Sequence, residues 1–154
     1  MPSTSPYELV IGLETHIQLA TASKMFCACA VRPDAPEPNR YCCPTCLGLP
    51  GALPSPNLGA VSLALRLGLA LGCTVHERTL FERKNYFYPD LPKGYQISQF
   101  RQPLCSGGSL PIGEGEAARR IGLERLHLEE DTGKLDHGAE VTRIDYNRSG
   151  IPLV

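Results

Sequence analysis

Two side chains suited to metal binding and acid–base chemistry, Glu14 and His16, alternate with apolar residues near the N-terminus. They lie in the stretch YELVIGLETHIQL, Tyr7 to Leu19, in which most odd-numbered positions are apolar. Successive side chains of a β-strand point to opposite faces, so this alternation predicts a strand with one polar face. Glu14 and His16 would stand on that face roughly 6–7 Å apart. The face either meets solvent or lines a site.

A second group of acidic side chains lies in RLHLEEDTGK, Arg125 to Lys134. Glu129, Glu130 and Asp131 are adjacent and repel one another, so a folded cluster of this kind needs a compensating cation. Carboxylate oxygens together with the imidazole of His127 suit Mg²⁺ or Mn²⁺ better than Zn²⁺. An acidic loop tip in solvent is the alternative, and it stays open at this point.

Five of the seven cysteines lie close together in a proline-rich stretch, residues 23–54. Clustered cysteines in odd number indicate a metal site rather than a disulfide framework. A C-x-C pair and a C-x-x-C turn of the zinc-knuckle type supply four thiolates for tetrahedral Zn²⁺: Cys27, Cys29, Cys43 and Cys46. We therefore predict an insertion that a structural zinc holds in shape. Free thiols are the alternative, and Cys42 is an alternative ligand to Cys43.

Basic residues suited to phosphate binding lie in the stretch RKNYFYPDLPKGYQ. Two prolines stiffen this stretch, so Arg83, Lys84 and Lys93 would be held at fixed positions, where an ammonium group binds phosphate as a point charge. Exposed surface lysines are the alternative. The sequence contains no G-x-x-x-x-G-K-[ST] motif, so a nucleotide would bind without a P-loop.

A last set of polar residues follows near the end of the sequence. Asp145 and Asn147 are expected on one face of a final strand, and Arg148 at the turn after it. By themselves these residues indicate a strand end and a turn. Together with the other segments they become a further source of polar groups for a pocket.

These groups need a scaffold, and the sequence predicts an α+β domain. The apolar stretch from Leu58 to Cys73 predicts a helix, with Ser55 as its cap, Pro56 in its first turn and Gly72 at its end. The face expected to pack on a sheet is Leu58, Val61, Leu65 and Leu69. The remaining pattern predicts a loop over 82–94 and a mostly antiparallel sheet built from 74–81, 95–100, 140–146 and a hairpin meander over 105–131.

The overall composition is that of a single globular domain of 154 residues with a net charge of −1. This charge gives no indication of a nucleic-acid partner. No secretory signal is visible, and the apolar stretch around Arg66 is too short to cross a bilayer, so we expect a cytoplasmic protein without a membrane partner. The sequence ends in the apolar run GIPLV, and we expect it to be part of a longer protein.

Six stretches resemble the B subunit family of the tRNA-dependent Asp/Glu amidotransferases, the GatB family: VIGLETHIQL, KMFCACA, YCCPTCLGLPG, RKNYFYPDLPKGYQISQ, RLHLEEDTGK and DYNRSGIPLV. The resemblance covers nearly the whole chain and implies the N-terminal part of a catalytic cradle similar to the glutamine synthetase fold. It implies ATP- and Mg²⁺-dependent phosphorylation of the side-chain carboxylate of Glu-tRNA(Gln) or Asp-tRNA(Asn). Ammonia released from glutamine by the amidase (A) subunit then forms the amide, and a small C subunit completes the enzyme.

The resemblance also implies roles for individual residues. The implied Mg²⁺ (or Mn²⁺) ligands are Glu14, His16, Glu129 and Glu130, which with Lys84 and Lys93 form the catalytic set. The implied ATP-binding set is Arg83, Lys84, Lys93, Asp131, Asp145, Asn147 and Arg148. The implied Zn²⁺ ligands remain Cys27, Cys29, Cys43 and Cys46. The alternative function is a zinc ribbon that binds nucleic acid, or a scaffold without its own active site.

Overall fold

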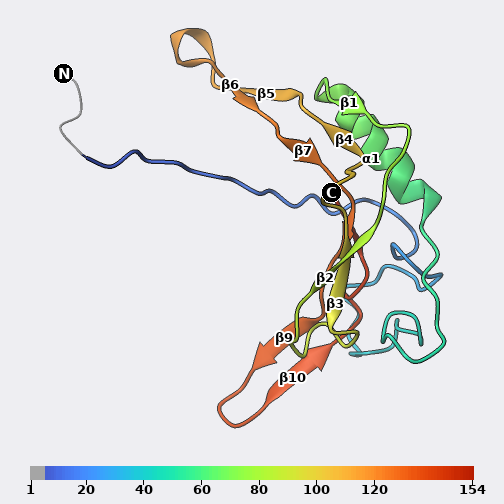
Figure 1. The fold of residues 1–154 in the computed structure, drawn as a ribbon. Helices are drawn as coiled ribbons and strands as arrows, with labels where there is room; N and C mark the ends of the chain where they lie inside the picture. Colours follow the sequence, from blue (N-terminus) through green and yellow to red (C-terminus); the bar gives the residue numbers. More distant parts are fainter. Residues whose placement is uncertain (1–5) are drawn as a thin grey trace.

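The computed structural model describes residues 6–154 as an α+β fold with one α-helix and short antiparallel strands (Figure 1). The helix is α1 (Leu58–Ala70), and a 3₁₀ turn spans Gly115–Ala117. The strands are β1 (Thr74–Val75), β2 (Glu82–Asn85), β3 (Tyr95–Ser98), β4 (Cys105–Ser106), β5 (Ser109–Ile112), β6 (Arg119–Gly122), β7 (Arg125–Leu126), β8 (Glu129–Glu130), β9 (Lys134–His137), β10 (Thr142–Asp145) and β11 (Pro152–Leu153).

The strands form several small sheets rather than one large sheet. A three-stranded sheet has the order β1-β4-β7, and the four remaining pairs are β2-β3, β5-β6, β8-β11 and β9-β10, all antiparallel. The predicted α+β class with antiparallel strands and one main helix is confirmed. The single sheet is replaced by ladders of two to four residues, and glycine follows directly after β4, β5 and β9.

The helix packs on the three-stranded sheet through its smallest residues. Its buried positions are Ala60, Ala64 and Gly68, spaced four apart on one face. A methyl group on Gly68 would lie 2.6 Å from Cys105 Sγ of β4, so glycine permits this close approach. The predicted packing face was wrong in part, because Leu58 is 80% exposed and Leu69 65% exposed.

The ends of the helix follow local rules. Asn57, not the predicted Ser55, caps the N-terminus, and its Oδ1 accepts hydrogen bonds from the amides of Gly59 and Ala60. Gly72 follows the last turn with φ +70°, as predicted for a left-handed end. The hydrophobic core beneath the helix includes Met25, Phe26, Ile97, Leu104, Cys105, Leu126 and Leu128.

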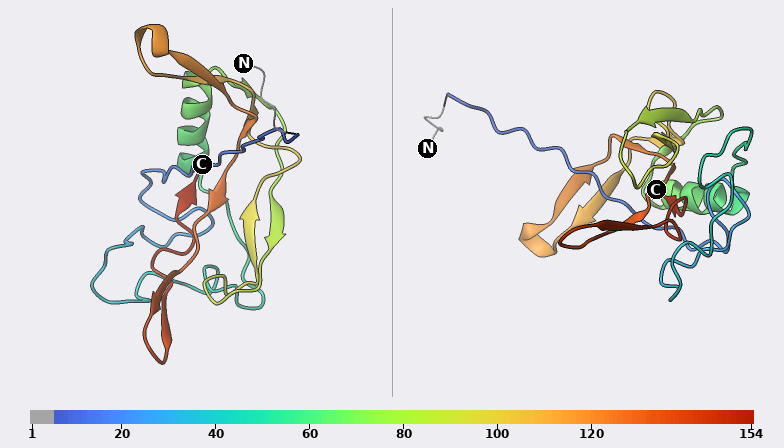
Figure 2. Two further views of the ribbon diagram at one scale, coloured as in Figure 1. Left: turned by 90° about the vertical axis from the view of Figure 1, so that its left-hand side faces the viewer. Right: turned by 90° about the horizontal axis from the view of Figure 1, so that it is seen from below.

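The predicted N-terminal strand over Tyr7–Leu19 is wrong. Gln18 forms an isolated β-bridge to Leu153, and Ile17 exchanges two backbone hydrogen bonds with Val154. Residues 6–16 belong to no strand and run as an extended segment away from the fold (Figures 1 and 2). Its alternating apolar side chains are exposed, with Leu9 at 83% and Leu13 at 86%. Alternation fixes a strand-like shape, but a strand also needs a neighbour for its backbone hydrogen bonds.

Other boundaries were predicted less accurately. The expected strand over 74–81 is only β1, and β2 forms within the expected loop because its residues pair with β3. The hairpin β9-β10 includes one strand that was not predicted. The hairpins β5-β6 and β9-β10 project at opposite ends of the molecule, and β3, which contacts β8, lies between them (Figures 1 and 2). Within residues 6–154 no helix has the length and apolarity needed to cross a bilayer.

Candidate active site and metal centre

The two glutamates of β8 are buried in the middle of the fold. They pair with β11 in the register Glu129–Leu153 and Glu130–Pro152. Glu129 is 3% exposed and Glu130 2% exposed, so an acidic loop tip in solvent is excluded for both. Because consecutive side chains of a strand point to opposite sides, each carboxylate has its own partners. A buried carboxylate is stable only when such partners compensate its desolvation.

The carboxylate of Glu129 contacts two imidazoles and a hydroxyl. Its Oε1 lies 2.9 Å from His16 Nε2, and its Oε2 lies 3.6 Å from His127 Nε2 and accepts a hydrogen bond of 3.1 Å from Ser98 Oγ. Burial raises the pKa of Glu129, but the hydrogen bond of His127 and the charge of His16 outweigh it, so the net pKa lies below its ordinary value. Glu129 is therefore an ionised carboxylate beside imidazole nitrogens.

The carboxylate of Glu130 forms a buried ion pair with Lys93. Lys93 Nζ lies 2.7 Å from Glu130 Oε1, which also accepts a hydrogen bond of 3.0 Å from the Ile97 amide. Burial raises the pKa of Glu130 because it outweighs the opposing effect of Lys93. Gly48 packs directly on the lysine stem, since a methyl group at Gly48 would lie 2.3 Å from Lys93 Cγ. The fold thus brings the predicted Lys93 and Glu130 together and fixes the ammonium group.

Asp131 and Arg148 meet at the end of β8. Arg148 Nε lies 3.6 Å from Asp131 Oδ2, and the guanidinium donates hydrogen bonds to the carbonyls of Thr132 and Gly133. Burial raises the pKa of Asp131, although the charge of Arg148 opposes this. The guanidinium therefore fixes the backbone that follows the two glutamates.

Three predicted site residues lie apart from this cluster. Glu14 is exposed on the extended N-terminal segment, and Lys84 is exposed on β2 opposite Gln96. Within the described part of the chain, neither forms an ion pair with Glu129 or Glu130. Arg83 stacks on the Tyr95 ring, with its guanidinium carbon 4.5 Å from the centroid. Their place in a site stays a prediction.

Asp145 and Asn147 hold the Cys-rich stretch against the end of β10. Asp145 Oδ1 accepts from the amides of Asn39 and Asn147. Asn147 is fully buried; its Oδ1 accepts from the Tyr41 amide, and its Nδ2 donates to the Glu37 carbonyl. In this structure both side chains contact the loop, and the structure does not bring them to the carboxylates of β8.

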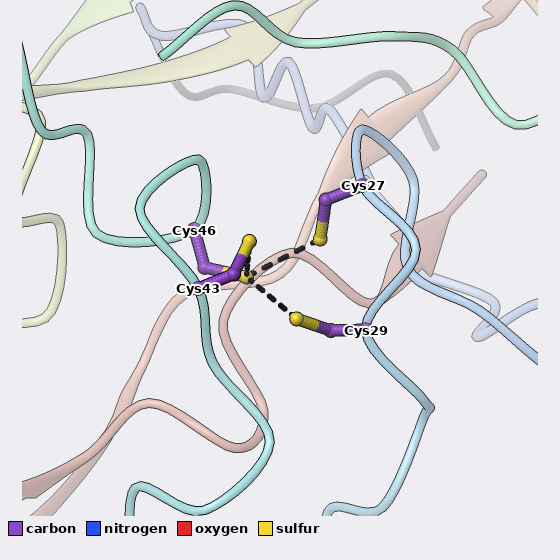
Figure 3. Close-up of side chains that lie close together, drawn as sticks. All are labelled: Cys27, Cys29, Cys43 and Cys46. Atoms are coloured by element: carbon purple, nitrogen blue, oxygen red, sulfur yellow. Dashed lines mark hydrogen bonds between the residues drawn. The ribbon is translucent and has the colours of Figure 1, made fainter.

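Four thiols converge within that stretch, as Figure 3 shows. The sulfurs of Cys27, Cys29, Cys43 and Cys46 all lie within 4.8 Å of one another, and Cys46 Sγ is 3.3, 3.8 and 3.7 Å from those of Cys27, Cys29 and Cys43. A tetrahedral Zn²⁺ with Zn–S bonds of about 2.3 Å separates its sulfurs by about 3.8 Å. The donor set therefore fits zinc. Cys42 is outside the cluster and donates its Sγ–H to the Asn39 carbonyl.

The thiols of this cluster differ in acidity. The hydrogen bond with Cys27 and the charge of Lys24 lower the pKa of Cys46 to about 4, although burial opposes this. Burial and neighbouring sulfurs raise the pKa of Cys29 to about 12, and the hydrogen bond with Cys46 and burial raise that of Cys27. Cys46 is thus the acidic thiol of the cluster, whereas Cys27 and Cys29 hold their protons more tightly.

Sequence reasoning missed several residues that complete these two sites. Ser98 binds Glu129, and Gln96 Nε2 donates to the Glu130 carbonyl. Both residues lie in the stretch RKNYFYPDLPKGYQISQ, but the sequence analysis gave neither of them a role. Lys24 is fully buried beside Cys46, and its position three residues before Cys27 was the only available signal. Asn39 could have been expected in a turn, because asparagine tolerates the left-handed region of backbone conformation. The structure places it there with a φ of 59°.

Fold and site together define a class of protein: an α+β domain with a buried carboxylate beside two imidazoles, and with four thiols that could hold a metal ion. Residues 9–154 match the family described as the GatB/GatE catalytic domain. The chain belongs to this family.

Curated relatives support the same assignment. The chain is 60% identical over 148 residues to a protein of Thermus thermophilus, 55% over 152 residues to one of Anaeromyxobacter sp. (strain Fw109-5), and 53% over 151 residues to one of Halobacterium salinarum. All three are named as the B subunit of aspartyl/glutamyl-tRNA(Asn/Gln) amidotransferase. The alignments cover 96%, 97% and 94% of this chain but 31%, 31% and 30% of the relatives, so it spans about a third of their length.

Proposed function

We propose that this chain forms the N-terminal part of the catalytic cradle in the B subunit of a tRNA-dependent amidotransferase. Its substrates would be Glu-tRNA(Gln) or Asp-tRNA(Asn), its cosubstrate ATP with Mg²⁺ or Mn²⁺, and its partners the amidase (A) and small (C) subunits. Membership of the family and the names of the relatives support this assignment. A role in translation favours the cytoplasm as its location and gives no reason for a membrane partner.

The proposed reaction converts a carboxylate into an amide in two balanced steps. A carboxylate oxygen of the aminoacyl group attacks the γ-phosphorus of ATP, and ADP leaves. Ammonia, released from glutamine by the A subunit, then attacks the activated carbonyl carbon and expels inorganic phosphate. The first step is needed because oxide is a poor leaving group, whereas phosphate is a good one.

The residues of β8 and its neighbours have the chemistry for the first step. Glu129 and His16 would hold Mg²⁺, which when bound neutralises phosphate charge. Glu130 and Glu14 would join them only if their side chains moved from the positions described above. Lys93 offers a fixed positive charge for the reacting carboxylate or a phosphate, and Lys84 would supply a second. The rim of the nucleotide site would be Arg83, Asp131, Asp145, Asn147 and Arg148.

The Cys-rich insertion, residues 23–54, would bind one structural Zn²⁺ through Cys27, Cys29, Cys43 and Cys46. The convergence of the four sulfurs supports this. A closed tetrathiolate leaves no open position for substrate, so the zinc would stabilise the loop and take no part in the reaction.

The observation that carries the proposed activity is the contact of 2.9 Å between His16 Nε2 and Glu129 Oε1 at a buried carboxylate. The test uses the complete amidotransferase with Glu129→Gln, a near-isosteric change that removes the charge. Amidation should fall at least 100-fold, while glutaminase activity and tRNA binding stay near wild type. Glu140→Gln, at an exposed position, is the matched control. Unchanged amidation in Glu129→Gln would instead favour a scaffold role.

The alternative, a zinc ribbon that binds nucleic acid, has little support in this stretch. Of its basic residues, Lys24 is fully buried and Arg40 pairs with Glu37 at 2.9 Å. Arg32 and Arg40 are exposed, but two separate cations do not make the basic cluster that nucleic-acid binding needs.

A further inference from the structure

Lys24 is a fully buried lysine whose ammonium group lies against the four-thiol cluster. Its Nζ donates to Cys46 Sγ at 3.7 Å and to the Tyr146 carbonyl at 3.0 Å. Its stem packs on Gly150, where a methyl group would lie 3.4 Å from Lys24 Cδ. The residue is therefore fixed by the fold, and its charge cannot reach water.

A buried ammonium group is stable only beside compensating negative charge. The Tyr146 carbonyl supplies a dipole but no charge. The same methyl group on Gly150 would lie 3.9 Å from Glu130 Oε2, but the charge of Glu130 is already paired with Lys93 at 2.7 Å. The cluster that contains Cys46 is thus the anionic partner that the fold offers to Lys24.

The charge balance of a zinc tetrathiolate fits this arrangement. Four thiolates and one Zn²⁺ carry a net charge of −2, which is costly to bury without a cation. An N–H···S hydrogen bond from an ammonium group offsets part of that charge at the sulfur it contacts. Since Tyr146 follows β10, the same ammonium group also links the zinc loop to the turn that leads to β11.

We propose that Lys24 is a positioning residue of the zinc centre, which neutralises the tetrathiolate charge and sets the affinity for the metal. The inference rests on the structural zinc proposed above. Partners of this kind outside the ligand shell change metal affinity by about 10- to 100-fold in other metal sites.

The test compares wild type, Lys24→Met and Arg32→Met in the full-length chain. Lys24→Met keeps an apolar stem of similar length and removes the charge, whereas Arg32→Met removes an exposed charge from the same loop. Zinc affinity is measured by competition with a chromogenic chelator, and thiolate ligation by the charge-transfer band of the Co²⁺ derivative. We expect about 10- to 100-fold weaker zinc binding in Lys24→Met, a shifted charge-transfer band, and wild-type behaviour in Arg32→Met.

The outcomes separate the two proposals. Wild-type protein that binds no zinc under reducing conditions overturns the zinc centre. Wild-type protein that binds zinc, with a folded Lys24→Met variant within threefold of its affinity, overturns the role of Lys24 alone.

A second measurement needs no variant, in case Lys24→Met does not fold. In the zinc-loaded wild type, acetic anhydride should modify Lys84 and leave Lys24 unmodified, and removal of zinc should raise the rate at Lys24. Equal rates at both lysines in the zinc-loaded protein would overturn the inference.

Discussion

The buried pair between Lys93 and Glu130 gives the sharpest test of the site. In Lys93→Met the ammonium group that lies 2.7 Å from Glu130 Oε1 is lost, and the Ile97 amide remains as a hydrogen-bond donor to the same oxygen. Removing one partner of a buried ion pair costs about 3–5 kcal/mol, because the other charge stays buried without compensation. We expect a loss of that size in the free energy of unfolding near pH 7.5.

The loss should depend on pH, and its sign follows from Glu130. Burial already raises the pKa of Glu130 in the folded protein, and removal of Lys93 takes away a cause that lowers it. A carboxyl group whose pKa is higher in the folded than in the unfolded protein lowers the free energy of unfolding as pH rises through its folded pKa. This loss is absent below the unfolded pKa, which is about 4.3 for glutamate. The difference in free energy of unfolding between Lys93→Met and wild type should therefore be small near pH 4.5 and should grow toward neutral pH.

Urea unfolding followed by circular dichroism at pH 5 and pH 7.5 measures this difference. The double variant Lys93→Met/Glu130→Gln should recover most of the loss, because no uncompensated charge remains. Lys84→Met, on the neighbouring strand but exposed, should stay within about 0.5 kcal/mol of wild type at both pH values. A deficit below about 1 kcal/mol at pH 7.5, or one that is equal at both pH values, would refute a charged, buried pair.

Two further predictions concern the packing around the site. Asn147→Ala removes the hydrogen bonds to the Tyr41 amide and the Glu37 carbonyl, so it should lower the free energy of unfolding by about 2–3 kcal/mol. The variant should also be cleaved faster by proteases within residues 23–54. An unchanged cleavage pattern would contradict the role of Asn147 in holding this loop. Gly68→Ala places a methyl group against Cys105 Sγ, so it should lower the free energy of unfolding, measured by thermal unfolding, by about 1–3 kcal/mol despite the better helix propensity of alanine. The double variant Gly68→Ala/Cys105→Ala should recover most of this stability.

The sequence alone determined the groups available for chemistry and the local turns that carry them. The C-x-C and C-x-x-C spacings indicated the four cysteines that converge, and the structure decided for Cys43 over the alternative Cys42. Gly72 ended the helix where its left-handed φ was needed. The α+β class and the hairpin β5-β6 followed from periodicity interrupted by glycine, since both depend on residues close in sequence.

Only the tertiary structure decided which groups meet. His16 and Glu129 come from opposite ends of the chain, and the path that joins them depends on β11 pairing with both Gln18 and β8. Asp145 binds the amide of Asn39 in the Cys-rich loop, 106 positions earlier in the chain, and Lys24 is buried beside Cys46, where only the fold places it. Local spacing sets which side chains share a face, but the neighbours of that face come from distant segments, and their packing selects the face that is buried.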